Sequence, residues 1–136
     1  MRLDRSHAQA PGQALVESAL VFPILVLLSL GVLQVMLYAH ARDVLVGAAQ
    51  EGARLAAEDG RSLDEGRARA NELIDAGLGS SVSPVQIEAT VAPDEVAVRI
   101  DSELRPILPI PIPGGLPLHV TGHAARERFR PGGGSL

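Results

Sequence analysis

A long apolar run near the N-terminus constrains this chain more than any other feature of its sequence. Residues 18–39 contain no charged side chain, and as a helix they are long enough to cross the roughly 30 Å of hydrocarbon in a bilayer. An acid, Glu17, stands directly before the run. A carboxylate inside a membrane costs on the order of 2.5–3.5 kcal/mol at mid-helix and less near the end, so the position of Glu17 needs a reason.

The composition argues against several classes of function. The chain of 136 residues has no cysteine, which removes disulfide frameworks, thiol catalysis and Cys-type zinc sites. Its net charge is −4, and no basic patch is large enough to suggest nucleic acid as a partner. The sequence shows no Ser/His/Asp set, catalytic carboxylate pair or phosphate-binding loop. We therefore predict neither an enzyme nor a bound cofactor.

Hydrophobic periodicity predicts that the apolar run continues as a helix into the polar part of the chain. Apolar spacings of three and four persist to Glu58, which indicates one helix of about 45 residues, or roughly 68 Å. Pro23 should kink this helix near its start, because its ring removes one backbone hydrogen bond. The apolar stripe beyond the charge-free run consists of Val44, Leu45, Ala48, Gly52, Leu55 and Ala56.

The remaining residues predict a second, short helix and a small sheet. A helical pattern covers residues 63–77 and stops at Gly77, and residues 79–84 are expected to form a loop. Strands are predicted from alternating apolar and polar residues at 85–91, 96–104 and 118–129. The proline-rich residues 105–117 predict a polyproline-like loop or a sheet edge. We therefore predict an α+β fold in which the outer half of the long helix covers the apolar face of an antiparallel sheet.

Two interpretations of the apolar run are conventional. A secretory signal peptide is supported by Ala39-His40-Ala41, which resembles a small-x-small cleavage site, although a signal h-region is expected to span only 7–15 residues. A single-span anchor fits the length of the run but gives no account of Glu17. Either one would make the chain a membrane-anchored or secreted envelope protein of unrelated role.

A third interpretation accounts for the acid. The short charged leader, Gly12, four residues, Glu17 and the apolar run resemble the class III signal of type IV pilins and pseudopilins. The resemblance implies that a prepilin peptidase cuts after Gly12, so that Gln13 becomes the N-terminus and Glu17 the fifth residue of the mature chain. Glu17 could then pair with the Gln13 ammonium of a neighbouring subunit. An unpaired buried charge is costly, so this pairing would set the register of assembly.

Two further segments of the sequence narrow this resemblance. The V-E-x-A-L-x-x-P segment is formed by Val16, Glu17, Ala19, Leu20 and Pro23, and the A-x-x-E-G-A-R segment by Ala48, Glu51, Gly52, Ala53 and Arg54. Together they resemble the TadE-like family, the minor pseudopilins of tight-adherence (Flp/Tad) pili. The Glu-Tyr pair of major pilins is absent, since Ser18 follows Glu17. The resemblance implies a pilin-like fold and a structural role in pilus assembly, adhesion or secretion. Its partners would be the prepilin peptidase, other Tad pilins and inner-membrane platform proteins.

The sequence also predicts a division of the chain and an orientation. We expect a leader at 1–12, a transmembrane part at 13–39, an extracytoplasmic pilin-like domain at 40–130 and a disordered tail at 131–136. Arg2 and Arg5 outweigh Asp4 in the leader, which places the N-terminus in the cytoplasm and the C-terminal domain outside. The predicted location is the cell membrane, in contact with lipid, before incorporation in a pilus.

Other candidate sites have structural interpretations of their own. The ridge of small residues formed by Ala48, Gly52 and Ala56 could pack against the protein's own sheet or against another subunit. His119 and His123 share one face of a strand but lie roughly 13 Å apart, too far to bind one metal ion. We expect a solvated edge at Arg126, Arg128 and Arg130, and an exposed helix face at Asp64, Glu65, Glu72 and Asp75.

Overall fold

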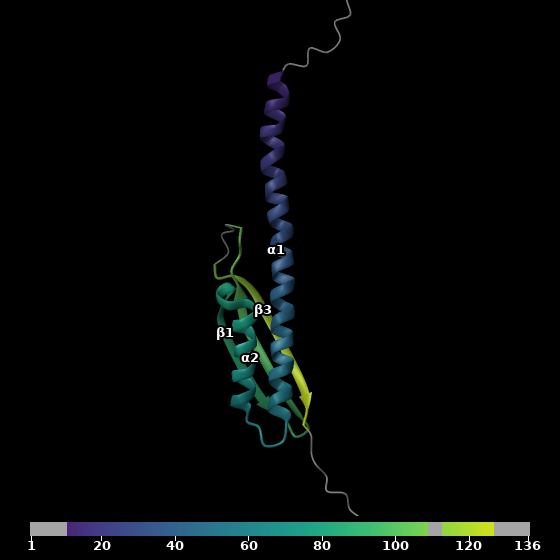
Figure 1. Cartoon of the computed structure of the whole chain (residues 1–136), viewed down its shortest axis with the longest axis vertical. Helices are drawn as coiled ribbons and strands as arrows, with labels where there is room; N and C mark the ends of the chain where they lie inside the picture. The colour runs from purple at the N-terminus through teal and green to yellow at the C-terminus, as the bar shows by residue number, and fades with distance from the viewer. Residues whose placement is uncertain (1–10, 109–112, 127–136) are drawn as a thin grey trace, which may run out of the picture.

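The computed structural model describes residues 11–108 and 113–126 as one long helix with a small α+β domain around its C-terminal half (Figure 1). Most of the predicted leader, the centre of the proline-rich segment, Arg128, Arg130 and the predicted tail lie outside the described residues. The elements are α1 (Pro11–Ala57), α2 (Leu63–Leu78), the 3-10 turn η1 (Gly79–Ser81), β1 (Val82–Val91), β2 (Glu95–Leu104) and β3 (Leu116–Ala125).

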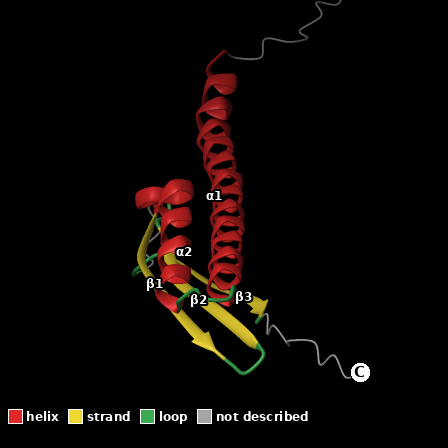
Figure 2. Ribbon diagram, turned by 60° about the horizontal axis from the view of Figure 1, so that its bottom comes forward, coloured by secondary structure: helices red, strands yellow, loops and turns green. Residues whose placement is uncertain are grey.

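The three strands form an antiparallel meander in the order β1-β2-β3, with β2 in the centre. Both helices pack on one face of this sheet, α1 over β2 and β3 and α2 over β1, and the two helices also contact each other (Figure 2). The other face of the sheet carries polar side chains. The predicted α+β class, the order of elements and the single apolar sheet face are confirmed.

The long helix spans 47 residues and continues through Pro23 without ending there. Its buried side is wider than the predicted stripe, because Ala41, Ala49 and Ala53 are buried as well, while Val44 and Leu55 are only partly buried. The reason is that this half of α1 has two neighbours, the sheet and α2, and each takes a different side of the helix. Alanine keeps the helix surface flat enough for both neighbours to approach.

The strand boundaries differ from the prediction at the prolines. Val82 already pairs with Leu104, and the ladder resumes at Val85 after an irregularity that contains Pro84, so the predicted loop at 79–84 is partly strand. The third strand likewise begins at Leu116 and ends at Ala125, earlier than predicted. Both strands lie at the sheet edges, where a missing N–H does not interrupt a second ladder.

The core lies between the helices and the sheet. Val98 and Ile100 of β2 face Leu45 of α1 and Ile74 of α2, and every one of these four side chains is fully buried. Gly122 of β3 lies under α1 so closely that an added Cβ would be 2.3 Å from the Ala49 carbonyl carbon. Such a spacing admits no side chain on that residue of the strand.

A capping box begins α2 and gives a first test of this fold. The Ser62 hydroxyl accepts a hydrogen bond from the Glu65 N–H at 3.2 Å, and the Ser62 N–H donates to the Glu65 carboxylate at 2.8 Å. The latter bond, with a smaller contribution from Arg61, lowers the pKa of Glu65. The resulting stabilisation is present above the ordinary glutamate pKa and is lost as the pH falls through the lowered value.

Ser62→Ala should therefore destabilise the domain by about 1 kcal/mol, because the first turn of α2 loses its cap. For a domain of this size that loss lowers the melting temperature by about 4–8 °C, which circular dichroism of the detergent-solubilised chain would measure. Ser80→Ala is the matched control, since Ser80 is exposed in η1. Equal melting temperatures for the two variants would contradict a stabilising role of the cap.

Candidate functional site

The N-terminal half of α1 projects beyond the domain as an isolated apolar helix (Figure 1). Every residue from Gly12 to Ser29 is exposed, and large apolar side chains such as Leu15 at 71 % and Phe22 at 69 % are left largely uncovered by the described part of the chain. The helix is long enough and apolar enough to cross a membrane. An exposed apolar surface of this extent fits a single-pass anchor and does not fit an aqueous environment.

The predicted processing residues lie on the first turns of this projecting helix. Gly12 has open space where a Cβ would be, and Gln13 follows it on the exposed helix. Glu17 lines a shallow hollow together with Ser18 and with apolar side chains such as Val21 and Phe22. No ion pair joins Glu17 to another residue in the described ranges 11–108 and 113–126. A charged partner would therefore have to come from outside this part of the chain.

Two polar side chains that the sequence analysis did not single out attach the domain to α1. The Ile107 N–H donates to Oε1 of Gln34 at 2.7 Å, and the Tyr38 hydroxyl donates to the Pro117 carbonyl at 3.1 Å. Gln34 is only 7 % exposed and is the first buried residue of α1. Packing on the domain thus begins within residues 13–39, the range expected to span the membrane. The signal in the sequence was a glutamine inside an otherwise apolar run.

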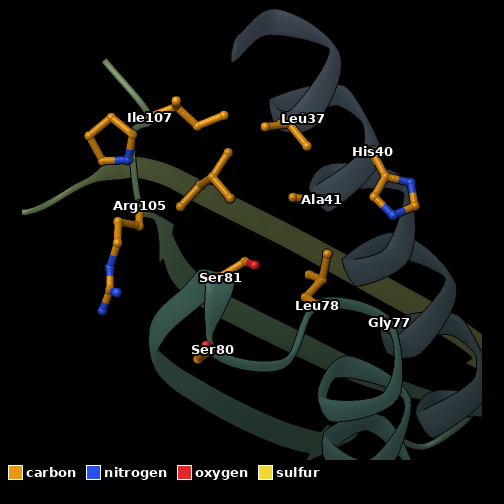
Figure 3. Close-up of a pocket in the computed structure, with 11 residues that line it drawn as sticks. Leu37, His40, Ala41, Gly77, Leu78, Ser80, Ser81, Arg105 and Ile107 are labelled. Carbon is orange, nitrogen blue, oxygen red and sulfur yellow. The ribbon is translucent and has the colours of Figure 1, made fainter. Parts of the chain in front are cut away.

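A cavity of about 580 Å³ lies next to this attachment, between α1, the end of α2 and the segment after β2. Leu37 and Ile107 point toward each other across it, while the Arg105 guanidinium points away (Figure 3). Ala41 and Leu78 contribute further apolar surface to the lining. The cavity opens to solvent and most of its lining is apolar, as expected where packing is incomplete at the end of the core.

The ridge of small residues on α1 lies against α2. A Cβ on Gly52 would be 2.8 Å from the Gly66 carbonyl oxygen, and a Cβ on Gly66 would be 2.7 Å from the Ala56 side chain. Ala48 is also buried in the core. These residues thus allow two helices of the same chain to approach closely, and within the chain their surface is already covered.

The outer face of the sheet carries two histidine–carboxylate contacts that join β3 to β2 and one arginine–carboxylate ion pair within β2. His119 contacts Asp101 at 2.6 Å, His123 contacts Glu95, and Arg99 donates to Asp101 at 2.8 Å. The hydrogen bonds from Arg99 and then from His119 lower the pKa of Asp101. Each histidine has a carboxylate of its own, and residues 11–108 and 113–126 contain no group of three potential ligands that could hold a metal ion.

The acids of α2 are exposed and contact polar side chains of the same helix. Arg67 donates a hydrogen bond to Asp64 at 2.8 Å, and Arg69 donates one to Glu72 at 2.8 Å. Asp75 accepts a hydrogen bond from Asn71. Pairs of this kind between exposed side chains contribute little free energy, so this face is a solvated surface.

A family of known proteins matches the chain over most of α1. Residues 12–54 match the family model described as TadE-like protein. The matched range contains the Gly12 to Glu17 spacing, the projecting half of α1 from Gly12 onward, and Ala48 and Gly52 of the small-residue ridge; it ends before Ala56 and before α2. No curated protein and no solved structure matches the chain.

Proposed function

Because the chain carries a TadE-like segment over residues 12–54, we propose that it is a minor pilin, or pseudopilin, of a Tad pilus system. It is held in the membrane by the projecting half of α1 and carries its α+β domain outside the cytoplasm. One observation carries this proposal. The exposed apolar half of α1 contains a single acid, Glu17, and it lies within the TadE-like segment. Its role is structural, in the assembly of pili that serve adhesion or secretion.

The proposed processing step explains the spacing between Gly12 and Glu17. A prepilin peptidase would cut after Gly12 and leave an ammonium group on Gln13 at the membrane surface. Glu17 of a neighbouring pilin would pair with that ammonium while both charges are partly removed from water. A subunit shifted out of register leaves both charges unpaired, which is strongly unfavourable. Other Tad pilins and the inner-membrane platform proteins are the expected partners.

The proposed division of the chain follows from the same model of function. Residues 1–12 are the leader, residues 13–39 enter the membrane, residues 40–130 form the domain, and residues 131–136 are a tail. The packing of Gln34 and Tyr38 on the domain supports a membrane surface near the C-terminal end of the second part. The charge of the leader supports an N-terminus in the cytoplasm.

The second candidate, an envelope protein released by a signal peptidase, requires a cut after Ala41. That site lies in the middle of α1, and Ala41 itself is buried against the domain at 1 % exposure. Cleavage there would also separate Gln34 and Tyr38 from the backbone groups that they bond. The geometry therefore argues against a cut after Ala41.

Expression in a host that supplies the Tad prepilin peptidase tests this proposal. Intact-mass analysis should find a chain that starts at Gln13, and Gly12→Leu should leave the full-length precursor in the membrane, because the side chain would not fit the peptidase. Gly47→Ala is a matched control on the same helix and should be cut normally, since open space surrounds Gly47. A mature chain that starts at Arg42 would instead establish the signal-peptide interpretation.

A further inference from the structure

The length of α1 that projects beyond the domain determines where a bilayer surface would meet the domain. From Gln13 to Leu33 the helix rises about 31 Å, which equals the hydrocarbon thickness of a typical bilayer. Gln34 is the first buried residue after this stretch. If the projecting helix spans the membrane, as proposed above, then the end of the domain that contacts Gln34 lies at the membrane–water interface.

The segment that contacts Gln34 is the turn after β2, at residues 105–108. Its backbone is held by two elements. The Ile107 N–H donates to Gln34 of α1, and the Arg105 N–H donates to the Ser81 carbonyl of η1 at 3.0 Å. The Ile107 side chain is nevertheless 47 % exposed. An apolar side chain is thus presented at the level of the expected interface on a backbone that two elements fix in place.

The neighbouring side chains have the chemistry of an interface. The Arg105 guanidinium is exposed and points away from the cavity, and it forms no ion pair within the described residues 11–108 and 113–126 (Figure 3). Tyr38 on α1 lies four residues, about one helical turn, beyond Gln34. A cation that can meet lipid phosphates and a tyrosine at the level of the headgroups are typical of such positions.

We propose that the turn at residues 105–108 rests in the headgroup layer of the bilayer, with Arg105 facing phosphate and with the exposed part of Ile107, whose side chain points toward Leu37 of α1, in contact with lipid. The occupant of this surface is phospholipid, because the surface is continuous with the apolar helix that enters the same bilayer. The contact would fix the depth and tilt of α1 before the subunit is extracted into a pilus. This inference rests on the proposed membrane anchor and adds a second membrane contact to it.

The chain contains no tryptophan, so single-tryptophan variants can report depth without background. Ile107→Trp reports the turn, and Leu25→Trp reports the centre of the projecting helix. Val91→Trp is the matched control, because Val91 is 52 % exposed at the opposite end of the domain. Each full-length variant is reconstituted in phosphatidylcholine–phosphatidylglycerol vesicles without brominated lipid, with lipids brominated near the headgroup end of the chains, or with lipids brominated deep in the chains.

Brominated lipid should quench Ile107→Trp at least about twofold more strongly than Val91→Trp, because only the former residue reaches the lipid. Leu25→Trp separates the two proposals. If Leu25→Trp is quenched by deeply brominated lipid and Ile107→Trp is not, the anchor holds and the proposed interfacial contact is wrong. If Ile107→Trp emits at a shorter wavelength without quenching, a protein surface covers it and the lipid contact is again wrong. Failure to quench Leu25→Trp would overturn the membrane anchor itself.

Discussion

Replacing Glu17 with alanine is expected to leave the chain in the membrane and correctly cut, but unable to join its partner pilins. The Gln13 ammonium would enter the assembly without its carboxylate. Breaking a partly buried ion pair typically costs about 3–5 kcal/mol, which is more than 100-fold in an association constant. Co-purification of the tagged chain with the other Tad pilins, quantified by mass spectrometry, measures the loss.

If the chain is only a single-span anchor, Glu17→Ala should not impair the protein. If Glu17 has no partner, its removal takes a polar group out of the apolar helix, and insertion should be unchanged or improved. Asp43→Ala is the matched control, because Asp43 is an exposed acid on the same helix outside the apolar run. Recovery of Glu17→Ala with the pilins at the wild-type level, equal to that of Asp43→Ala, would refute the pairing mechanism.

Gly122→Ala is expected to destabilise the domain by about 3 kcal/mol or more, because an added Cβ would collide with the backbone of α1. The colliding atoms include the Ala49 carbonyl carbon at 2.3 Å and the Gln50 nitrogen at 2.4 Å. Backbone atoms cannot rotate away as a side chain can, so α1 must move off β3 or the strand must bend. The melting temperature should fall by more than about 10 °C.

The chain has one tyrosine, and its position makes it a probe of this contact. Tyr38 bonds the Pro117 carbonyl at the start of β3, so its fluorescence reports the packing of α1 on the strand while circular dichroism follows the fold. Gly47→Ala is the control, because nothing lies within 4 Å of that Cβ position and alanine favours the helix by about 1 kcal/mol. A Gly122→Ala domain that melts within about 2 °C of the wild type would show that the contact is not tight in solution.

The sequence was sufficient for the elements whose signals are local. An uninterrupted 3.6-residue period predicted α1 and its continuation past Ala39, and a two-residue alternation predicted the buried face of β2. The predictions were weaker wherever proline occurs. Pro84 was interpreted as part of a loop, and Pro117 as part of a polyproline-like loop or a sheet edge. Both lie in edge strands, and the edge position depends on the order of the strands rather than on the residues themselves.

By itself, therefore, the sequence determined the apolar helix, the Gly12 to Glu17 spacing, the TadE-like segment and the α+β class, because each is a pattern of neighbouring residues. Only the tertiary structure decided that Gly122 lies under Ala49, that Gly52 meets Gly66, and that Gln34 bonds the turn at Ile107. The two members of each pair are far apart along the chain, and the hydrophobic periodicity of the sequence does not indicate which distant backbones come within a few ångströms of each other. The level at which the domain meets α1, and with it the proposed membrane surface, follows from those contacts alone.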